Sequence, residues 1–369
     1  MSDTPLPPPE ESPGLPAEPV PAAAFPDLDS SNSELSPAND ACLTLAPRPQ
    51  GPIARFFLDA TNRLRTPFRL FLFIVVLAVL LVGLQIDVFL ALVAGLLWQE
   101  VPLGEVGPRI LQLADTQPLA LQFFLAGPTV LVTLVVLELF RRQVDRRTLM
   151  SSGFVPVTAR RVGLAGFGLV IGGGVIAAGA FFAWAAGQYV ASDPAPIGWV
   201  WWSLLPTLIL MAFFEEIVFR GYLLQNFRDI GWPVTGVVIS SVLFWLVHSF
   251  NPAAWSTVWI GVNLFGAGVA LSLAYMASGD IWFPTAVHFA WNYMQAPLLG
   301  IPVSGMETES LLRIEPRPDI ADWISGGGFG LEGSAVCIPL NLVLCAIFGA
   351  MIWRQSAGKI DASLPADER

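Results

Sequence analysis

Charged residues are scarce in this sequence. Lysine, arginine, aspartate and glutamate make up only 13% of its 369 residues, whereas soluble domains carry about 25%. Hydrophobic residues make up 54%, and the mean hydropathy is +0.63. The composition therefore excludes an ordinary soluble domain and is typical of a membrane protein.

Cysteine is also rare, and only Cys42, Cys337 and Cys345 are present. Their spacing matches neither a zinc knuckle nor a disulfide framework, so we interpret them as packing or incidental residues. The N-terminus lacks a basic start followed by an apolar run, and we therefore expect no signal peptide.

Most of the net charge of -10 comes from the N-terminal segment 1–52, which holds eight acidic residues, one basic residue and 13 prolines. Such a segment cannot bury enough apolar surface to fold on its own. We predict a disordered, acidic and proline-rich tail there, followed by a basic juxtamembrane segment at 53–69.

Long apolar runs dominate the rest of the chain. A helix needs about 20 apolar residues to cross a bilayer core, and runs of this length are too long for the strands of a membrane barrel. We predict an all-α, polytopic membrane bundle in which Gly172, Gly173 and Gly174 allow close helix contact. The eight predicted spans are 70–97, 118–140, 162–186, 199–224, 234–250, 256–277, 281–299 and 331–353.

Basic residues are concentrated on one side of the predicted membrane. They precede the first span, separate the second from the third and follow the fourth and eighth, whereas the alternate loops hold only Arg109, Arg313 and Arg317. The positive-inside rule therefore predicts that both termini are cytoplasmic. The predicted regions are N-terminal spans at 70–190, a polar-residue-bearing core at 199–299, a non-cytoplasmic loop at 300–330, a last helix at 331–353 and a cytoplasmic tail at 354–369.

Three ionisable residues occur inside the fourth span, in the stretch FFEEIVFRG. Charge at the centre of a membrane helix costs about 2.5 to 3.5 kcal/mol, so such residues pair or have a function. Glu216 and Arg220 are four residues apart and can neutralise each other on one helix face. Glu215 lies on another face and has no local partner.

The only two histidines, His248 and His288, both fall in predicted spans. Glu215 and His248 are nearly equidistant from the turn at 228–233, so an antiparallel hairpin places them at the same depth. His288 lies nearer to the turn that precedes its own helix. It reaches the level of Glu215 and His248 only if the polar stretch 222–228 extends beyond the bilayer as a helical overhang. Asn292 follows His288 by one turn.

These groups suit the hydrolysis of a carbonyl compound. Glu215 and His248 can activate a water molecule, while His288 and Asn292 can donate hydrogen bonds to an oxyanion. Glu215, His248 and His288 also provide enough ligands for an open zinc site. No HExxH helix is present, and the sequence alone leaves metal-free and zinc-assisted hydrolysis both open.

The stretches EEIVFRG, FWLVH and HFAWN, in this order on three spans, resemble the three motifs of the CAAX prenyl protease and bacteriocin-processing family of intramembrane endopeptidases. The resemblance covers about 199–299. It implies that Glu215 and His248 activate the water, that His288 and Asn292 line the oxyanion site, and that Glu216 and Arg220 support the first motif. Eukaryotic members remove the last three residues of prenylated proteins, and the family has been described both as metalloproteases and as metal-independent.

We therefore expect an intramembrane endopeptidase, in a bacterial cytoplasmic membrane, whose partners are membrane lipids and a membrane-associated protein or peptide, and no nucleic acid. A non-proteolytic immunity or regulatory protein is the alternative function. A proton-coupled transporter is a third, because intramembrane Glu and His residues also form proton relays.

Overall fold

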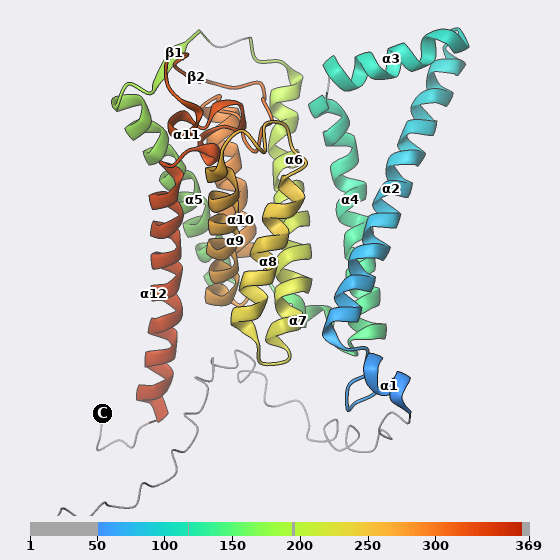
Figure 1. Ribbon diagram of the computed structural model, residues 1–369, viewed down its shortest axis with the longest axis vertical. Coiled ribbons are helices and arrows are strands. Elements are labelled where there is room, and N and C mark those ends of the chain that lie inside the picture. The colour runs from blue at the N-terminus through green and yellow to red at the C-terminus, as the bar shows by residue number, and fades with distance from the viewer. Residues whose placement is uncertain (1–50, 117, 194–195, 364–369) are drawn as a thin grey trace, which may run out of the picture.

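A computed structural model describes residues 51–116, 118–193 and 196–363. In these residues the chain forms a bundle of long helices that run side by side along one axis (Figure 1). The predicted disordered tail lies outside the described residues except for its last two positions, and so does Cys42. Residues 364–369 of the predicted C-terminal tail also lie outside.

Each predicted span corresponds to one helical segment in the described residues, and the all-α polytopic fold is confirmed. Three of the segments contain a stretch of π-helix. The segments are α2 (Thr66–Trp98), α4 (Pro118–Leu139) with η3 (Phe140–Val144), α5 (Ala159–Ala185), α6 (Trp199–Glu216) with η5 (Ile217–Leu224) and α7 (Gln225–Arg228), α8 (Pro233–His248), α9 (Val258–Ser278), α10 (Trp282–Tyr293) with η6 (Met294–Leu298), and α12 (Cys337–Ser363).

Six of these segments are long and apolar enough to cross a membrane. The other two are α8 and α10. α8 has 16 residues, or about 24 Å of helix. α10 carries His288 and Asn292, and most of its side chains are buried. α10 therefore lies inside the bundle, whereas α8 exposes Val238 and Val247, and α2 exposes Phe71 and Val79, as lipid-facing helices do.

The last predicted span, 331–353, begins too early. Leu331–Gly333 forms a separate 3-10 turn, η8, and α12 begins only at Cys337. Gly330 and Gly333 lie on either side of Glu332, and they keep the long helix from beginning there. Cys337 is buried and Cys345 half-buried in α12, and both are free thiols, as predicted for packing residues.

Short elements occupy the two ends of the bundle. The predicted loop at 300–330 is folded, and we call residues 300–336 the cap. Within it, β2 pairs antiparallel with β1, from Tyr189↔Pro316 to Ser192↔Arg313, so the fold has a small strand ribbon that the sequence did not predict. The short elements are α1 (Pro52–Phe57), α3 (Leu103–Thr116), η4 (Leu149–Ser152), β1 (Tyr189–Ser192), β2 (Arg313–Pro316), α11 (Asp322–Ser325), η7 (Gly327–Phe329) and η8.

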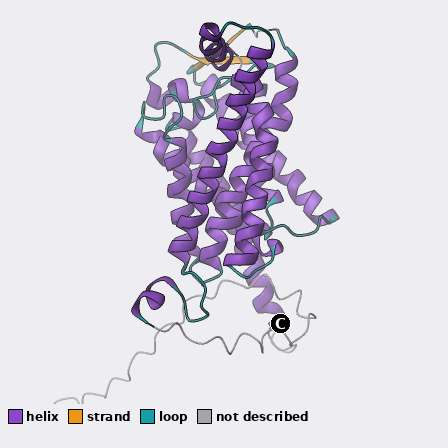
Figure 2. Cartoon of the chain, turned by 90° about the vertical axis from the view of Figure 1, so that its right-hand side faces the viewer, coloured by secondary structure: helices purple, strands orange, loops and turns teal. Residues whose placement is uncertain are grey.

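The described chain begins and ends on the same side of the bundle. α1 and the C-terminal end lie at the bottom in Figure 1, and the strand ribbon and α11 lie at the top. The view from the side shows the same separation (Figure 2). An even number of crossings gives this arrangement, while the predicted cytoplasmic location of that end stays a prediction.

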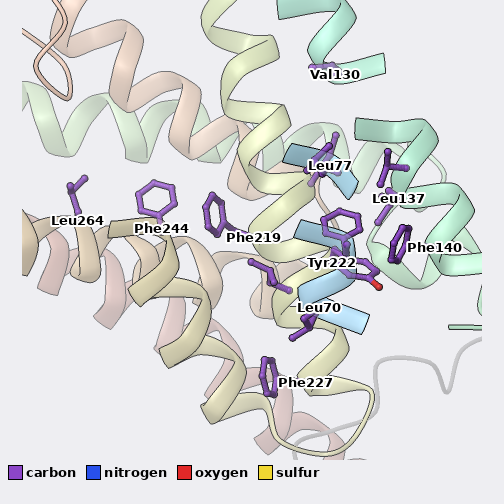
Figure 3. Close-up of a cluster of buried hydrophobic side chains, with 14 of the residues drawn as sticks. Leu70, Leu77, Val130, Leu137, Phe140, Phe219, Tyr222, Phe227, Phe244 and Leu264 are labelled. Carbon is purple, nitrogen blue, oxygen red and sulfur yellow. The ribbon is translucent and has the colours of Figure 1, made fainter. Parts of the chain in front are cut away.

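Aromatic packing fixes α2 and α4 against the segment that carries the glutamate pair. The ring of Phe73 in α2 stacks on Tyr222 in η5, with centroids 3.8 Å apart, and Phe140 packs edge-on against both rings. Figure 3 shows how this cluster continues through Phe219 to Phe244 in α8. The apolar core therefore reaches directly to the motif helices.

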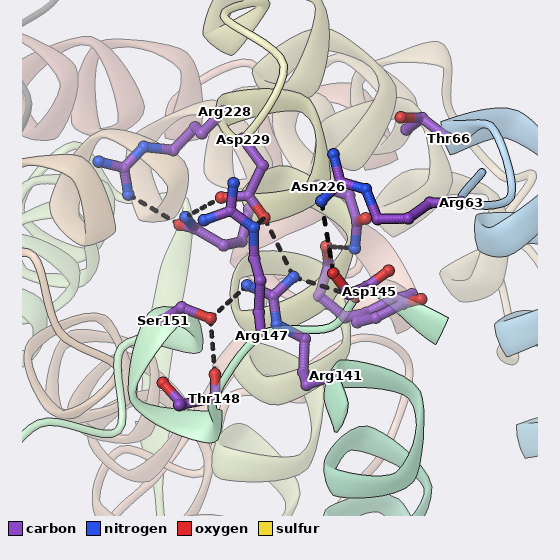
Figure 4. Close-up of polar contacts among 12 residues, drawn as sticks. Arg63, Thr66, Arg141, Asp145, Arg147, Thr148, Ser151, Asn226, Arg228 and Asp229 are labelled. Carbon is purple, nitrogen blue, oxygen red and sulfur yellow. Dashed lines mark hydrogen bonds and ion pairs between the residues drawn. The ribbon is translucent and has the colours of Figure 1, made fainter. Parts of the chain in front are cut away.

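A buried ion cluster holds the same elements together near the α1 end. Arg141 Nη1 lies 3.1 Å from Asp145 Oδ2 and 3.1 Å from Asp229 Oδ2 (Figure 4). Arg69 of α2 also contacts Asp145, at 3.4 Å. Burial raises the pKa of Asp145, and the two arginines oppose that shift. The cluster joins α2, η3 and the α7–α8 turn.

Close contact between α5 and α10 depends on glycine, as the glycine-rich third span predicted. A β-carbon at Gly172 would lie 2.3 Å from the carbonyl oxygen of Val287. Gly173 also faces α10 but leaves 3.6 Å, and Gly174 has nothing within 4 Å. Gly172 therefore sets how near α10, and with it His288, approaches α5.

Candidate active site

The glutamate pair lies where an α-helix becomes a π-helix. α6 ends at Glu216, and η5 begins at the next residue. The predicted pair is present: Arg220 Nη1 donates to Glu216 Oε1 at 2.9 Å, and both side chains are fully buried. Arg220 Nη2 also donates to the Gly268 carbonyl of α9, at 3.1 Å. π-Helical turns often occur at functional sites.

His288 contacts this ion pair. Its Nδ1 lies 2.9 Å from Glu216 Oε1. Because Glu216 is the ionised partner of Arg220, it accepts this hydrogen bond and Nδ1 carries the proton. In the neutral ring Nε2 is then an acceptor, and it lies 3.8 Å from Glu215 Oε2.

His248 is held in the same tautomer by its own helix. Its Nδ1 lies 2.8 Å from the carbonyl oxygen of Phe244, which can only accept, so Nδ1 is the donor. Nε2 therefore faces Glu215 as an acceptor, again 3.8 Å from Oε2. The Phe244 ring packs against both imidazoles, with centroids 4.5 and 5.9 Å away.

Glu215 thus lies between the two histidines. Its Oε2 atom is buried and has no hydrogen-bond partner among the described residues. A separation of 3.8 Å is too long for a direct hydrogen bond. The site brings Glu215, His248 and His288 together, as the sequence predicted.

Glu215 and His248 lie at the same level of the bundle, where they contact each other, as their distances from one turn predicted. The start of α10 lies beside η5, since the Ile281 side chain is near Gly221, and α7 continues past that level. Within α7, Gln225 Oε1 accepts a hydrogen bond from Tyr275 Oη of α9, at 3.0 Å. The segment therefore stays helical past the level where α10 begins, and its extension beyond the bilayer stays a prediction.

Asn292 is half-buried one turn beyond His288 and lines the same cavity as the two histidines. Its side chain forms no hydrogen bond to any described residue. Its amide group is therefore free to bind a ligand.

Residues 197–294 match a family model described as type II CAAX prenyl endopeptidase Rce1-like. We call residues 197–294 the Rce1-like segment. The match confirms the resemblance inferred from the three motifs. No curated protein and no solved structure matched the chain.

The Rce1-like segment contains every site residue predicted from the sequence, from Glu215 to Asn292. The cavity beside it extends further, to residues that the sequence analysis missed. It is lined by Phe244, His248, Leu264, Ala267, Ala270, Leu271, Val287, His288, Trp291, Asn292, Ser304, Glu332, Asn341 and Leu344. Its last four residues lie outside the Rce1-like segment, in the cap and α12.

Glu332 is the main cavity residue that the sequence did not predict. Its Oε1 accepts from Trp291 Nε1 at 3.1 Å, and its Oε2 accepts from the Ser304 amide and hydroxyl at 2.8 and 3.0 Å. Burial raises the pKa of Glu332, and the Ser304 hydrogen bonds oppose that shift. The signal in the sequence was an acidic residue inside the predicted span 331–353.

The types of side chain at the site suit zinc, because Glu215, His248 and His288 offer one carboxylate and two imidazoles. As placed, however, no group of three or more His, Cys, Asp or Glu residues in the described ranges is arranged to hold a metal ion. The zinc site stays a prediction.

Proposed function

We propose that the chain is an intramembrane endopeptidase of the CAAX prenyl protease type, in which Glu215 and His248 activate a water molecule. The observation that carries the proposal is the position of Glu215 Oε2, buried, unpaired among the described residues and 3.8 Å from both imidazole Nε2 atoms. A water about 2.8 Å from a carboxylate oxygen and from an imidazole nitrogen bridges such a gap.

Both groups accept hydrogen bonds, because His248 Nδ1 already carries its proton. A bridging water donates one hydrogen to each and directs its lone pair away from them. As the water oxygen bonds to the carbonyl carbon, one water proton moves to Glu215. The carbon–nitrogen bond then breaks, and that proton passes to the leaving amine.

The developing oxyanion needs donors. Asn292 provides its free amide group directly, and one such donor contributes about 10²- to 10³-fold in rate. His288 Nε2 donates only when the ring is doubly protonated, because Nδ1 already donates to Glu216. Glu216 and Arg220 keep this ring in place and do not contact the substrate.

The substrate in this proposal is a membrane-associated protein or peptide, and the enzyme is a multi-pass protein of a bacterial cytoplasmic membrane with both termini in the cytoplasm. The support is the family match for the site and the exposed apolar faces of helices such as α2. Labelling of single cysteines introduced at Arg55 and Asp319 tests the orientation. Only the first should be accessible from the cytoplasm.

Cleavage of membrane-tethered peptides in proteoliposomes tests the function. Glu215→Gln keeps the shape of the side chain but removes the base, so we expect cleavage to fall by about 10²- to 10⁴-fold, and His248→Ala to fall similarly. Glu105→Gln makes the same change at an exposed position in α3 and should have no effect. Full cleavage by both site variants would refute the proposal, and so would the failure of the folded wild-type protein to cleave any peptide.

A further inference from the structure

In the part of the chain that the structure describes, buried acidic side chains have arginine partners, with one exception. Of the four buried acids in the described residues, Glu216 pairs with Arg220, Asp145 with two arginines and Asp280 with Arg161. Glu332 is 9% exposed and forms no ion pair with any described residue. A buried carboxylate without a counter-charge is costly, and the basic side chains that line its cavity are His248 and His288, neither of which forms an ion pair with it.

The hydrogen bonds that Glu332 and Asn341 already form show which groups the cavity can bind. The carboxylate of Glu332 has about four lone-pair sites, of which Ser304 and Trp291 use three. Asn341 Nδ2 donates to the Asn263 carbonyl at 3.2 Å, which fixes the orientation of its amide. Its Oδ1 has no hydrogen-bond partner among the described residues, although Asn341 is only 4% exposed. The unused capacity of Glu332 and Asn341 is therefore for accepting hydrogen bonds.

The size and remaining walls of the cavity suit a side chain. The cavity has a volume of about 50 Å³, and about 10 to 15 Å³ holds one water. The space thus takes a few non-hydrogen atoms in a row, like the end of a lysine side chain. The apolar wall residues suit methylene groups and are Leu264, Ala267, Ala270, Leu271, Val287 and Leu344.

The cap holds Glu332 rigidly at this cavity. Asn263 Nδ2 donates to the Glu332 carbonyl at 2.8 Å. Gly330 has a φ of +91°, and a β-carbon there would lie 1.7 Å from the Pro302 carbonyl oxygen. Gly326 has a φ of +88°, and a β-carbon there would lie 1.8 Å from the Gly330 carbonyl oxygen. A carboxylate fixed in this way needs little reorganisation to bind a charged group.

We propose that this cavity is a specificity subsite for a basic side chain of the substrate, with Glu332 as its counter-charge and Asn341 Oδ1 as a second acceptor. The inference rests on the proposed function, because the cavity shares His248, His288 and Asn292 with the site. The methylene stem of the basic residue lies along the apolar wall, and its nitrogen reaches the two acceptors. An acidic side chain is rejected because neither acceptor can pair with it.

Paired peptides test the subsite. Peptides with lysine, norleucine or glutamate at each position around the cleaved bond are bound to the inactive Glu215→Gln variant in nanodiscs. Norleucine has nearly the length of lysine but no charge. We expect lysine to bind about 10- to 100-fold more tightly at one position, and glutamate to bind most weakly. Equal binding of lysine and norleucine peptides at every position would overturn the proposal.

Variants separate recognition from support of the cap. In the same background, Glu332→Gln should bring lysine and norleucine affinities close together, whereas Glu332→Asp should restore part of the difference. Glu307→Gln, an exposed acid in the same cap, should leave the difference intact. If Glu332→Gln weakens both peptides equally, the residue only holds the cap and the proposal fails.

The test also distinguishes this inference from the proposed function. Cleavage of the same peptides is measured with the wild-type protein. Lysine-selective binding without any cleavage would leave the subsite standing and remove the endopeptidase. Cleavage with no preference for lysine would support the endopeptidase and remove the subsite.

Discussion

His288 Nδ1 and Arg220 Nη1 each lie 2.9 Å from the same oxygen atom, Oε1 of Glu216. Glu216 therefore links two of the three motifs: it neutralises the arginine of its own helix and fixes the tautomer of a histidine on α10. Its other oxygen, Oε2, is buried without a hydrogen-bond partner among the described residues. Stability and orientation of the site thus depend on one carboxylate that does not face the reacting atoms.

Glu216→Gln should destabilise the protein strongly. The substitution leaves Arg220 buried with no charged partner, and breaking a buried ion pair costs about 3 to 5 kcal/mol. Chemical unfolding in detergent, followed by tryptophan fluorescence, measures the change in the free energy of unfolding.

The control for Glu216 is a more exposed pair with the same spacing. Glu138 pairs with Arg142, whose side chain is 70% exposed. Glu138→Gln should therefore cost less than about 1 kcal/mol. Equal losses in the two variants would show that the buried pair has no special role.

Gly172→Ala should reduce both stability and cleavage. Its β-carbon would meet the Val287 carbonyl oxygen at 2.3 Å, a contact that only a shift between α5 and α10 relieves. His288 follows Val287, so this shift moves the imidazole away from Glu215. We expect a loss of about 1 to 3 kcal/mol and a fall in kcat, both measured beside Gly174→Ala. Gly174 has nothing within 4 Å, and a similar loss there would contradict the explanation.

Much of the bundle and site followed from the sequence because the membrane restricts the alternatives. Long apolar runs can only be helices there, and rare polar residues within them are forced to find partners. Spacing alone then predicted the pair of Glu216 and Arg220, and distances from one turn predicted that Glu215 and His248 meet.

Three features did not follow from local patterns. The π-helix η5 looks like any apolar helix in sequence, since its hydrogen-bond register depends on packing against α4, α8 and α9. The contact between His288 and Glu216 spans 72 positions. Glu332 was not predicted as a site residue because the apolar run after it was extended back into a span. Its flanking glycines instead place it in the cap.

Removal of metal distinguishes the two hydrolytic mechanisms that the sequence left open. We expect cleavage to survive prolonged dialysis against a strong chelator, because Glu215 and His248 are positioned to bridge a water without an ion. A zinc peptidase treated in parallel serves as the control. The zinc alternative is correct instead if cleavage disappears, returns with added zinc, and the wild-type protein holds one zinc ion that His248→Ala lacks.

Asn292→Ala tests the oxyanion donor by its effect on the two kinetic constants. Asn292 contacts no described residue through its side chain, so its removal should leave the unfolding free energy nearly unchanged. A donor that acts only on the developing charge stabilises the transition state and not the bound substrate. We therefore expect kcat to fall by about 10²- to 10³-fold while KM changes little. Asn292→Asp should be at least as slow, because a carboxylate there repels the oxyanion. A rise in KM with unchanged kcat would instead place Asn292 among the groups that bind the substrate before reaction.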